Sequence, residues 1–169
     1  ITDLYQRISE GRLAQAVEPG DYQQREVAAD YIQRIADDVQ LERPLKVVVD
    51  AGNGVAGDIA PQLLEAIGAE VIPLFCEVDG TFPNHHPDPS EPHNLADLVA
   101  TVARLGADLG IAFDGDGDRL IAVDEQGHVV DGDCLIALAA VDLLNRGVLT
   151  HNTVVVTSMT NLGFHRAMA

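Results

Sequence analysis

Three aspartates that alternate with two glycines form the segment with the clearest chemical potential in this sequence. Asp114, Asp116 and Asp118 lie in the run DGDGDR, between two short apolar stretches. In an extended loop alternate side chains point to the same side, and Gly115 and Gly117 permit the tight backbone that convergence requires. Hard oxygen ligands select Mg²⁺, Mn²⁺ or Ca²⁺, and three protein ligands leave positions open for a phosphoryl oxygen. The run therefore predicts a metal site.

Arg119 follows the loop directly, and its guanidinium can bind a phosphate held at that metal. An EF-hand calcium loop is an alternative, because Glu125 falls at the twelfth position counted from Asp114. Against it, Arg119 occupies the sixth position, where an EF-hand needs glycine, and predicted strands flank the loop. A plain Asp-Gly hairpin turn accounts for one Asp-Gly pair but not for two followed by a third aspartate.

A glycine-rich loop lies closer to the N-terminus than the aspartate loop. Gly52, Gly54 and Gly57 match G-x-G-x-x-G between a predicted strand and helix, and Glu77 lies twenty residues beyond Gly57. This pattern favours a dinucleotide-binding oxidoreductase fragment as an alternative. Pro73 interrupts the second strand of that unit and weighs against it. The same glycines also suit a tight structural turn with no ligand.

The run Asn84, His85, His86, Pro87 and Asp88 offers two adjacent histidines and an acid, which suggests zinc. Neighbouring side chains of an extended chain diverge, however, and no partner pair at helical spacing is present. We therefore expect a solvated loop.

The composition excludes several classes of partner. A net charge of −17 disfavours nucleic acid and anionic membranes, which require Lys or Arg, and favours a cation. The sequence has no signal peptide and no apolar run long enough to span a membrane. Cys76 and Cys134 lie far apart without a pattern, which indicates a reduced, cytoplasmic protein. A non-catalytic interaction module is a third hypothesis and rests only on the acidic surface.

The elements that must position these loops alternate between strand and helix, which predicts an α/β fold with a mixed, mainly parallel sheet and flanking helices. Apolar runs predict strands, and helical spacing of apolar residues predicts helices. The expected strands are 46–50, 69–75, 108–113, 120–123 and 153–157, and the expected helices are 4–9, 24–39, 58–67, 95–105, 133–144 and 162 onward. A hairpin turn is expected at 125–127, and a loop at 79–93.

The sequence resembles the phosphomannomutase/phosphoglucomutase family, the α-D-phosphohexomutases. The likeness rests on VVVDAGNGVAGDIAPQLLEAIGAEVIPLFCEVDGTFPNHHPDP and on DGDGDR, the metal-loop motif of the family. Residues 1–119 are most similar to the bacterial bifunctional phosphomannomutase/phosphoglucomutase, whereas residues 120–169 are closer to phosphoglucosamine mutase. Cys134 stands where the bifunctional enzymes usually carry a basic residue, and Met159 near the position of a lysine, which puts the hexose-phosphate contacts of the third domain in doubt.

The resemblance implies the second of four domains, with partial neighbouring domains at both ends. Residues 1–24 would be the tail of the first domain and a linker, 25–131 the complete metal-binding second domain, and 132–169 a truncated start of the third. Both ends of the chain are therefore expected to be cut. Apolar surface that other domains would cover predicts self-association.

The resemblance also implies an activity. The family interconverts 1-phospho and 6-phospho hexoses through a phosphoserine and a bisphosphorylated sugar, with hexose 1,6-bisphosphate as intermediate and activator. By this likeness Asp114, Asp116 and Asp118 bind Mg²⁺, Arg119 lies near the phosphoserine, and Gly52, Gly54 and Gly57 form a structural turn. No loop of the Ser-His-Asn-Pro type is present, so no catalytic residue is expected here and the fragment alone should be inactive. A phosphoglucosamine mutase fragment is the alternative.

Overall fold

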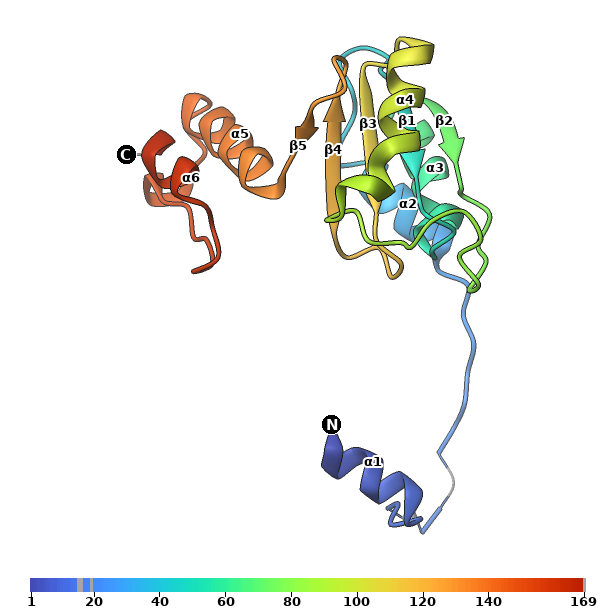
Figure 1. The fold of residues 1–169 in the computed structure, drawn as a ribbon. Coiled ribbons are helices and arrows are strands. Elements are labelled where there is room, and N and C mark those ends of the chain that lie inside the picture. The colour runs from blue at the N-terminus through green and yellow to red at the C-terminus, as the bar shows by residue number, and fades with distance from the viewer. Residues whose placement is uncertain (15–16, 19, 169) are drawn as a thin grey trace.

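A mixed five-stranded sheet is the centre of the fold in the computed structural model, which describes residues 1–14, 17–18 and 20–168. The strands are β1 (Lys46–Asp50), β2 (Glu70–Leu74), β3 (Leu109–Phe113), β4 (Leu120–Asp124) and β5 (Val129–Val130). Their order is β2-β1-β3-β4-β5 (Figure 1). β1 pairs in parallel with β2 and β3, and the β3–β4 and β4–β5 pairs are antiparallel. Among the described strands, β4 alone runs against the others, which confirms the predicted fold class.

Helices cover both faces of the sheet, because the side chains of β1 are apolar on both sides. The helices of this unit are α2 (Ala28–Ala36), α3 (Ala56–Ala66) and α4 (Ala96–Leu105). Val48 packs with Leu98 of α4 on one face, whereas Val47 and Val49 pack with Leu64 of α3 on the other. α2 lies outside α3. The continuous apolar run of β1 is therefore buried between two cores, as expected for the central strand of an α/β sheet.

The connections between the strands bring two loops together. β1 leads through α3 to β2 on one side, and β2 leads through α4 to β3 on the other side of β1. The chain therefore first moves from β1 to one side of the sheet and then returns to the other side, so the direction in which strands are added reverses between β1 and β3. Ligands of α/β sheets bind at such a reversal, beyond the carboxyl ends of the strands. The loops that begin here are the glycine turn, after Asp50, and the aspartate loop, after Phe113.

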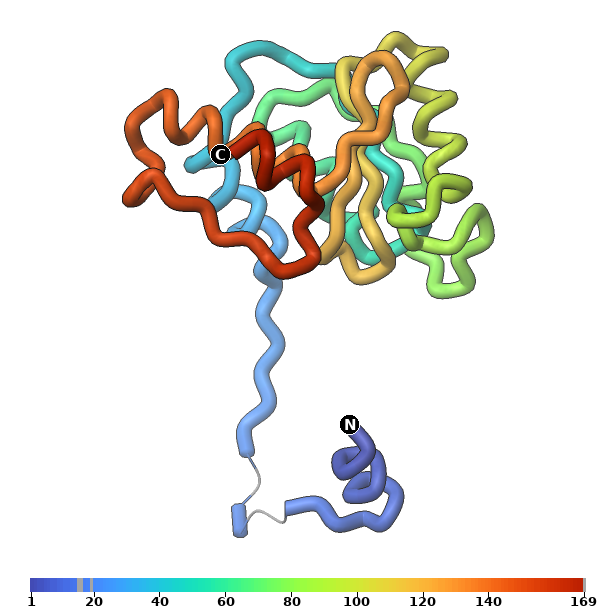
Figure 2. The backbone as a smooth tube through the Cα atoms, turned by 60° about the vertical axis from the view of Figure 1, so that its left-hand side comes forward, coloured from blue at the N-terminus to red at the C-terminus, as the bar shows by residue number. Residues whose placement is uncertain are grey.

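Three further helices lie outside the sheet unit: α1 (Thr2–Ser9), α5 (Gly132–Asn145) and α6 (Leu162–Ala167). The short 3₁₀ segments are η1 (Pro92–Leu95) and η2 (Thr150–Asn152). α5 packs on α6, and Phe164 is buried there. Figure 2 shows α1 apart from the sheet, at the end of an extended stretch. The division of the chain into domains and its self-association stay predictions.

One predicted strand is absent. Residues 153–157 are extended but carry no strand assignment, and none of the described strands pairs with them. Extended apolar chain becomes a strand only when a neighbour completes its hydrogen bonds. Three helices also have other bounds than expected: α1 and α3 each begin two residues earlier, whereas α2 begins four residues later and ends three residues earlier.

Pro73 does not interrupt the second strand, which corrects the argument drawn from it. β2 pairs with β1 through Pro73, opposite Val49. β2 lies at the border of the sheet, so the missing N–H of proline costs no ladder bond. At the other end of the sheet, the hairpin turn predicted at 125–127 is present, with Gly127 at φ 86°.

The start of β3 is fastened to the start of β1 by a carboxylate, which makes the fold sensitive to acid. Asp108 Oδ2 accepts a hydrogen bond of 2.8 Å from the backbone N–H of Lys46, and this bond is the main cause that lowers the pKa of Asp108. A pKa that is lower in the folded state stabilises the fold above the unfolded pKa, and this contribution is lost as the pH falls below about 4.

We therefore expect Asp108→Asn to lower the melting temperature by a few degrees at neutral pH. The difference from the wild type should shrink as the pH falls through about 4, because the wild-type carboxylate is then protonated. Thermal unfolding followed by circular dichroism at several pH values measures this. Glu42→Gln, an exposed change of the same charge nearby, is the control. A difference that does not depend on pH would contradict the prediction.

Candidate metal centre

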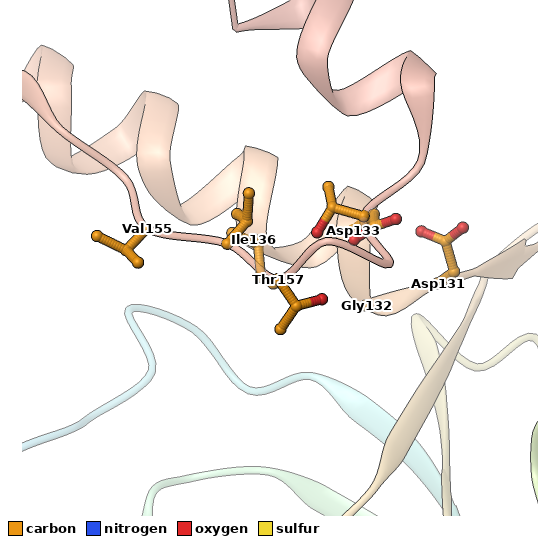
Figure 3. Close-up of a pocket in the computed structure, with 8 residues that line it drawn as sticks. Asp131, Gly132, Asp133, Ile136, Val155 and Thr157 are labelled. Carbon is orange, nitrogen blue, oxygen red and sulfur yellow. The ribbon is translucent and has the colours of Figure 1, made fainter.

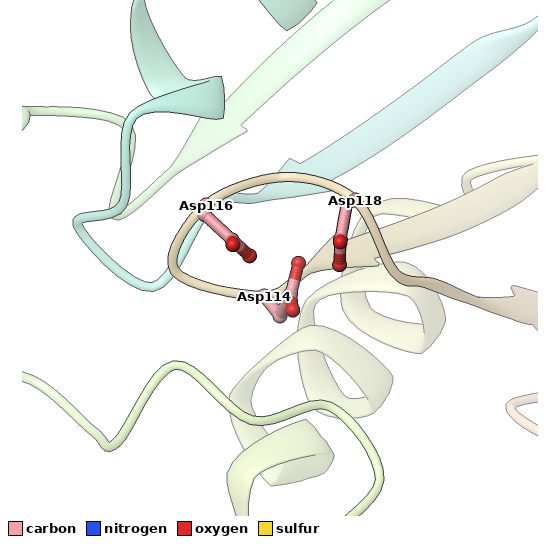
Figure 4. A group of neighbouring side chains, drawn as sticks. All are labelled: Asp114, Asp116 and Asp118. Atoms are coloured by element: carbon pink, nitrogen blue, oxygen red, sulfur yellow. The ribbon is translucent and has the colours of Figure 1, made fainter. Parts of the chain in front are cut away.

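The aspartate loop brings its three carboxylates to one point. One ligand oxygen each of Asp114, Asp116 and Asp118 lies within 4.8 Å of the others, and the side chains point toward a common centre (Figure 4). Asp114 is buried, whereas the other two are exposed. Gly117 adopts φ 75°, and its N–H donates to the Asp114 carbonyl at 3.1 Å, which turns the chain so that the carboxylates converge.

The spacing of these oxygens fits a small cation. An octahedral Mg²⁺ with ligands at about 2.1 Å separates adjacent oxygens by about 3 Å and opposite ones by about 4.2 Å. The three oxygens lie within 4.8 Å of one another, slightly more than the separation of opposite ligands around Mg²⁺. A small movement of the two exposed side chains would bring the oxygens to the distances that Mg²⁺ requires. In the part of the chain that the structure describes, no other three acidic, histidine or cysteine side chains lie this close. Metal binding itself stays a prediction.

Arg119 holds the buried aspartate in its charged form. The Asp114 carboxylate accepts from the backbone N–H of Arg119 at 3.0 Å and from its Nε at 2.6 Å. Burial alone would raise the pKa of Asp114, but these hydrogen bonds and the positive charge outweigh it and lower the pKa. The Arg119 side chain is 62 % exposed and also lies 3.9 Å from Asp118. The exposed guanidinium group therefore remains accessible to an anion.

The flanking strands fix the width of this loop and exclude the EF-hand alternative. Phe113 pairs with Leu120, and the N–H of Asp114 donates to the Arg119 carbonyl at 3.2 Å. The predicted twelfth ligand, Glu125, follows the five residues of β4. A strand of that length spans about 17 Å, so Glu125 lies at the far end from the loop.

The glycine turn packs directly against the metal loop. The backbone N–H of Val55 donates to the Gly115 carbonyl at 3.2 Å, and a Cβ on Gly54 would lie 2.7 Å from the same oxygen. The N–H groups of Asn53 and Gly54 donate to the carbonyls of Phe75 and Ala51. Donors already engaged by the protein cannot hold a pyrophosphate, so the geometry favours a structural turn over a dinucleotide site.

The first and third glycines of this turn are required for different reasons. Gly52 adopts φ 52°, in the left-handed region that favours glycine. A Cβ on Gly57 would lie 2.2 Å from the Cys76 carbonyl oxygen, where no side chain fits. The turn therefore fixes where α3 starts and how closely it approaches the end of β2.

The proline-rich loop is not the solvated loop that we expected. His86 is exposed, but the His85 side chain is only 15 % exposed, and its Nε2 lies 3.1 Å from the buried carboxylate of Asp50. Pro87 is buried, and Asp88 lies 3.8 Å from Arg119. Sequence reasoning missed these contacts because the partners are up to 35 residues apart and share no pattern. No zinc-like cluster forms around the histidines among the described residues.

A hollow lies at the start of α5 (Figure 3). Asp131 and Asp133 border it, but hydrogen bonds within the protein already engage both carboxylates. Asp131 accepts from the Cys134 N–H at 2.8 Å and Asp133 from the Asn161 N–H at 2.8 Å. The remaining lining includes Ile136 and Val155. This hollow therefore gives no separate catalytic arrangement.

The layered sheet, with helices on both faces, defines an α/β domain, and comparison with known proteins identifies its family. The family description "Phosphoglucomutase/phosphomannomutase, alpha/beta/alpha domain II" matches residues 29–127. The chain therefore belongs to the phosphoglucomutase/phosphomannomutase family. Among the described residues, no helix is both long and apolar enough to cross a bilayer.

Individual relatives cover most of the chain. A Pseudomonas aeruginosa phosphomannomutase/phosphoglucomutase is 53 % identical over 146 residues, which are 86 % of this chain and 31 % of that protein. A phosphoglucosamine mutase of Desulforudis audaxviator is 51 % identical over 124 residues, which are 73 % of this chain and 27 % of that protein. A crystal structure of a family protein from Burkholderia thailandensis matches with 47 % identity and a TM-score of 0.78, over 86 % of this chain and 31 % of its own. The chain thus spans about a third of the length of these relatives, and it resembles both kinds of mutase.

Proposed function

We propose that this chain is the magnesium-binding part of a phosphohexomutase that interconverts 1-phospho and 6-phospho forms of mannose and glucose. The observation that carries the proposal is the convergence of three carboxylates at the reversal of strand order, within a domain of this family. The name of the Pseudomonas relative supports the choice of sugars. The family and the fold of the chain support both the metal assignment and the reaction that we propose.

In this proposal Asp114, Asp116 and Asp118 hold Mg²⁺, and Arg119 binds phosphate. When bound, the cation withdraws negative charge from a phosphoryl oxygen during transfer. Arg119 forms a charge-assisted hydrogen bond with Asp114 and keeps nitrogens free for phosphate. The phosphoryl group would move between a phosphoserine and the sugar through hexose 1,6-bisphosphate, which would also activate the intact enzyme.

The phosphoserine would come from another part of a longer protein. Ser9, Ser90 and Ser158 are the serines of this sequence, and none lies in a Ser-His-Asn-Pro motif. The hydroxyl of Ser90 donates to Asp88 at 2.6 Å, as part of a local turn. We therefore propose that this chain alone binds metal without turning over substrate. The same proposal includes a cytoplasmic location, which rests on the two unpatterned cysteines, and no nucleic-acid or membrane partner, which rests on the net charge of −17.

A phosphoglucosamine mutase is the second candidate, favoured by the similarity to the Desulforudis enzyme. The two candidates differ in the sugar that the intact enzyme accepts, so they share the metal site. An assay of a full-length parent with glucose 1-phosphate, mannose 1-phosphate and glucosamine 1-phosphate would separate them.

The metal assignment is tested by titrating Mg²⁺ into the isotope-labelled chain and following its amide resonances. We expect saturable shifts centred on residues 114–119 in the wild type. In Asp116→Asn the affinity should fall at least about tenfold, because a charged ligand is lost from the first coordination sphere. Asp37→Asn, an exposed change of equal charge at the end of α2, is the matched control.

Two outcomes would count against the assignment. Shifts that persist unchanged in Asp116→Asn would place the cation elsewhere. A chain that ignores Mg²⁺ and Mn²⁺ but binds NAD at residues 52–57 would restore the oxidoreductase alternative.

A further inference from the structure

A buried aspartate and a histidine lie beside the metal loop and have no role in the proposed reaction. Asp50 is the last residue of β1, and its side chain is 1 % exposed. Its Oδ1 accepts from the Gly52 N–H at 2.8 Å. The Nε2 of His85 lies 3.1 Å from Oδ2 and 3.2 Å from Oδ1. The rings of Phe75 and His85 pack edge to face, with their centroids 5.5 Å apart. The imidazole is therefore enclosed, not free in a solvated loop.

Both ring nitrogens of His85 face hydrogen-bond acceptors. Nδ1 lies 2.9 Å from the His86 carbonyl oxygen, which cannot donate, so Nδ1 carries a proton. Nε2 faces the Asp50 carboxylate, and one more proton is needed between them. The couple therefore holds two protons, either as imidazolium and carboxylate or as neutral imidazole and carboxylic acid. With one proton fewer, a ring lone pair would face either the His86 carbonyl oxygen or the Asp50 carboxylate, depending on the tautomer.

The segment that His85 begins is bonded to the metal loop. The Pro87 carbonyl accepts from the Gly115 N–H at 3.1 Å, and a Cβ on Gly115 would already lie 3.2 Å from Pro87 Cγ. One residue further, Asp88 lies 3.8 Å from Nη1 of Arg119. Residues 85–88 thus contact the end of β1 through His85 and the metal loop through Pro87 and Asp88.

We propose that Asp50 and His85 are positioning residues for the metal loop. Their shared proton holds residues 85–88 in place, and the Pro87 carbonyl in turn fixes Gly115 between the first two metal ligands. The inference rests on the proposed magnesium site, although neither residue touches the cation. It assigns a role in metal affinity to two residues that lie outside the aspartate loop.

The charged and titratable groups around the couple are few among the described residues. Burial raises the pKa of Asp50, and the negative charge of Asp97 on α4 acts in the same direction, whereas the Gly52 hydrogen bond and His85 lower it. His86 and Asp88 flank the contact within the segment itself.

Asp50→Asn keeps the contact without the carboxylate. An asparagine of the same shape accepts from the Gly52 N–H through Oδ1 and donates through Nδ2 to the Nε2 of a neutral His85. The contact between the two side chains is then complete without a charge. His85→Ala removes the contact altogether, and His86→Ala changes only an exposed side chain beside it.

The experiment measures two quantities on this chain. They are the hydrogen-exchange protection of the Gly115 amide, without metal, and the dissociation constant for Mg²⁺. In Asp50→Asn both should match the wild type, because the contact with His85 is kept. In His85→Ala the Gly115 amide should lose protection and Mg²⁺ affinity should fall about tenfold, a typical effect of outer-shell partners, while His86→Ala matches the wild type.

Two results would overturn the inference: a His85→Ala variant that keeps both Gly115 protection and Mg²⁺ affinity, or a folded Asp50→Asn variant that loses both. If His85→Ala does not fold, Asp50→Ala, which removes the partner of His85 instead, decides in the same way. A chain that ignores Mg²⁺ while Gly115 loses its protection in His85→Ala would overturn the proposed metal site and support the positioning role. The two failures are thus distinguishable.

Discussion

Replacing Gly57 by alanine should unfold the sheet unit, although alanine is the better helix former. In an exposed helix the exchange would stabilise the protein by about 1 kcal/mol. Here the added Cβ would lie 2.2 Å from the carbonyl oxygen of Cys76 and 2.8 Å from its carbonyl carbon. These are backbone atoms at the end of β2, so no side-chain rotation relieves the overlap. The helix or the strand end must move, and either movement separates α3 from the core.

The cost should exceed the usual range of overpacking, about 1–3 kcal/mol, because the clash is with backbone. Chemical unfolding followed by circular dichroism measures it. Gly132→Ala, at the first position of α5 with open space around it, is the control and should leave the stability unchanged or raised. A Gly57→Ala variant as stable as the wild type would show that the approach of α3 to β2 is looser than the structure indicates.

Leu98→Ala should cost about 2–5 kcal/mol, the range for deleting a large core side chain. Leu98 is 0 % exposed and packs from α4 against Val48 and Val123 of the sheet. Its removal leaves a cavity beside β1, β3 and β4. The paired strands are rigid and cannot move in to fill this cavity. Leu138→Ala on α5, where the side chain is 69 % exposed, should change the stability by less than about 0.5 kcal/mol. Equilibrium unfolding in urea compares the two.

The strand beneath Leu98 offers a sharper version of this test. A Cβ on Gly110 would lie 2.8 Å from Cγ2 of Val102 and 3.0 Å from Cδ1 of Leu98. Gly110→Ala alone should therefore destabilise by about 1–3 kcal/mol through overpacking. The double variant with Leu98→Ala should lose less than the sum, because the new methyl group enters the space that the leucine left. Strict additivity would mean that the two side chains do not share that space.

The sequence predicted those features whose causes are local. The three carboxylates of Asp114, Asp116 and Asp118 lie within five residues of one another, so the alternation of aspartate and glycine was enough to predict that they converge. The predicted strands at 46–50 and 108–113 agree with β1 and β3 to within a residue. A central strand is buried on both faces, so its sequence is a continuous run of apolar residues that is easy to recognise.

Features that depend on distant partners could not be predicted in this way. The run TVVVT at 153–157 has the composition of β1, yet it forms no strand because no neighbour pairs with it among the described residues. α3 begins at Ala56 because the preceding Val55 bonds to Gly115 across the sheet end, and not because of a capping side chain. The burial of His85 depends on Asp50, 35 residues away. Such contacts are properties of the assembled sheet.

The two borders of the sheet have a consequence for how copies of this chain meet. β2 carries Pro73, which has no N–H to offer a further strand, and β5 is only two residues long. Neither border is a good template for recruiting strands from another copy, and such recruitment is the route to fibrils. The self-association predicted for this chain would therefore proceed through apolar side chains and remain reversible on dilution, without growing into amyloid.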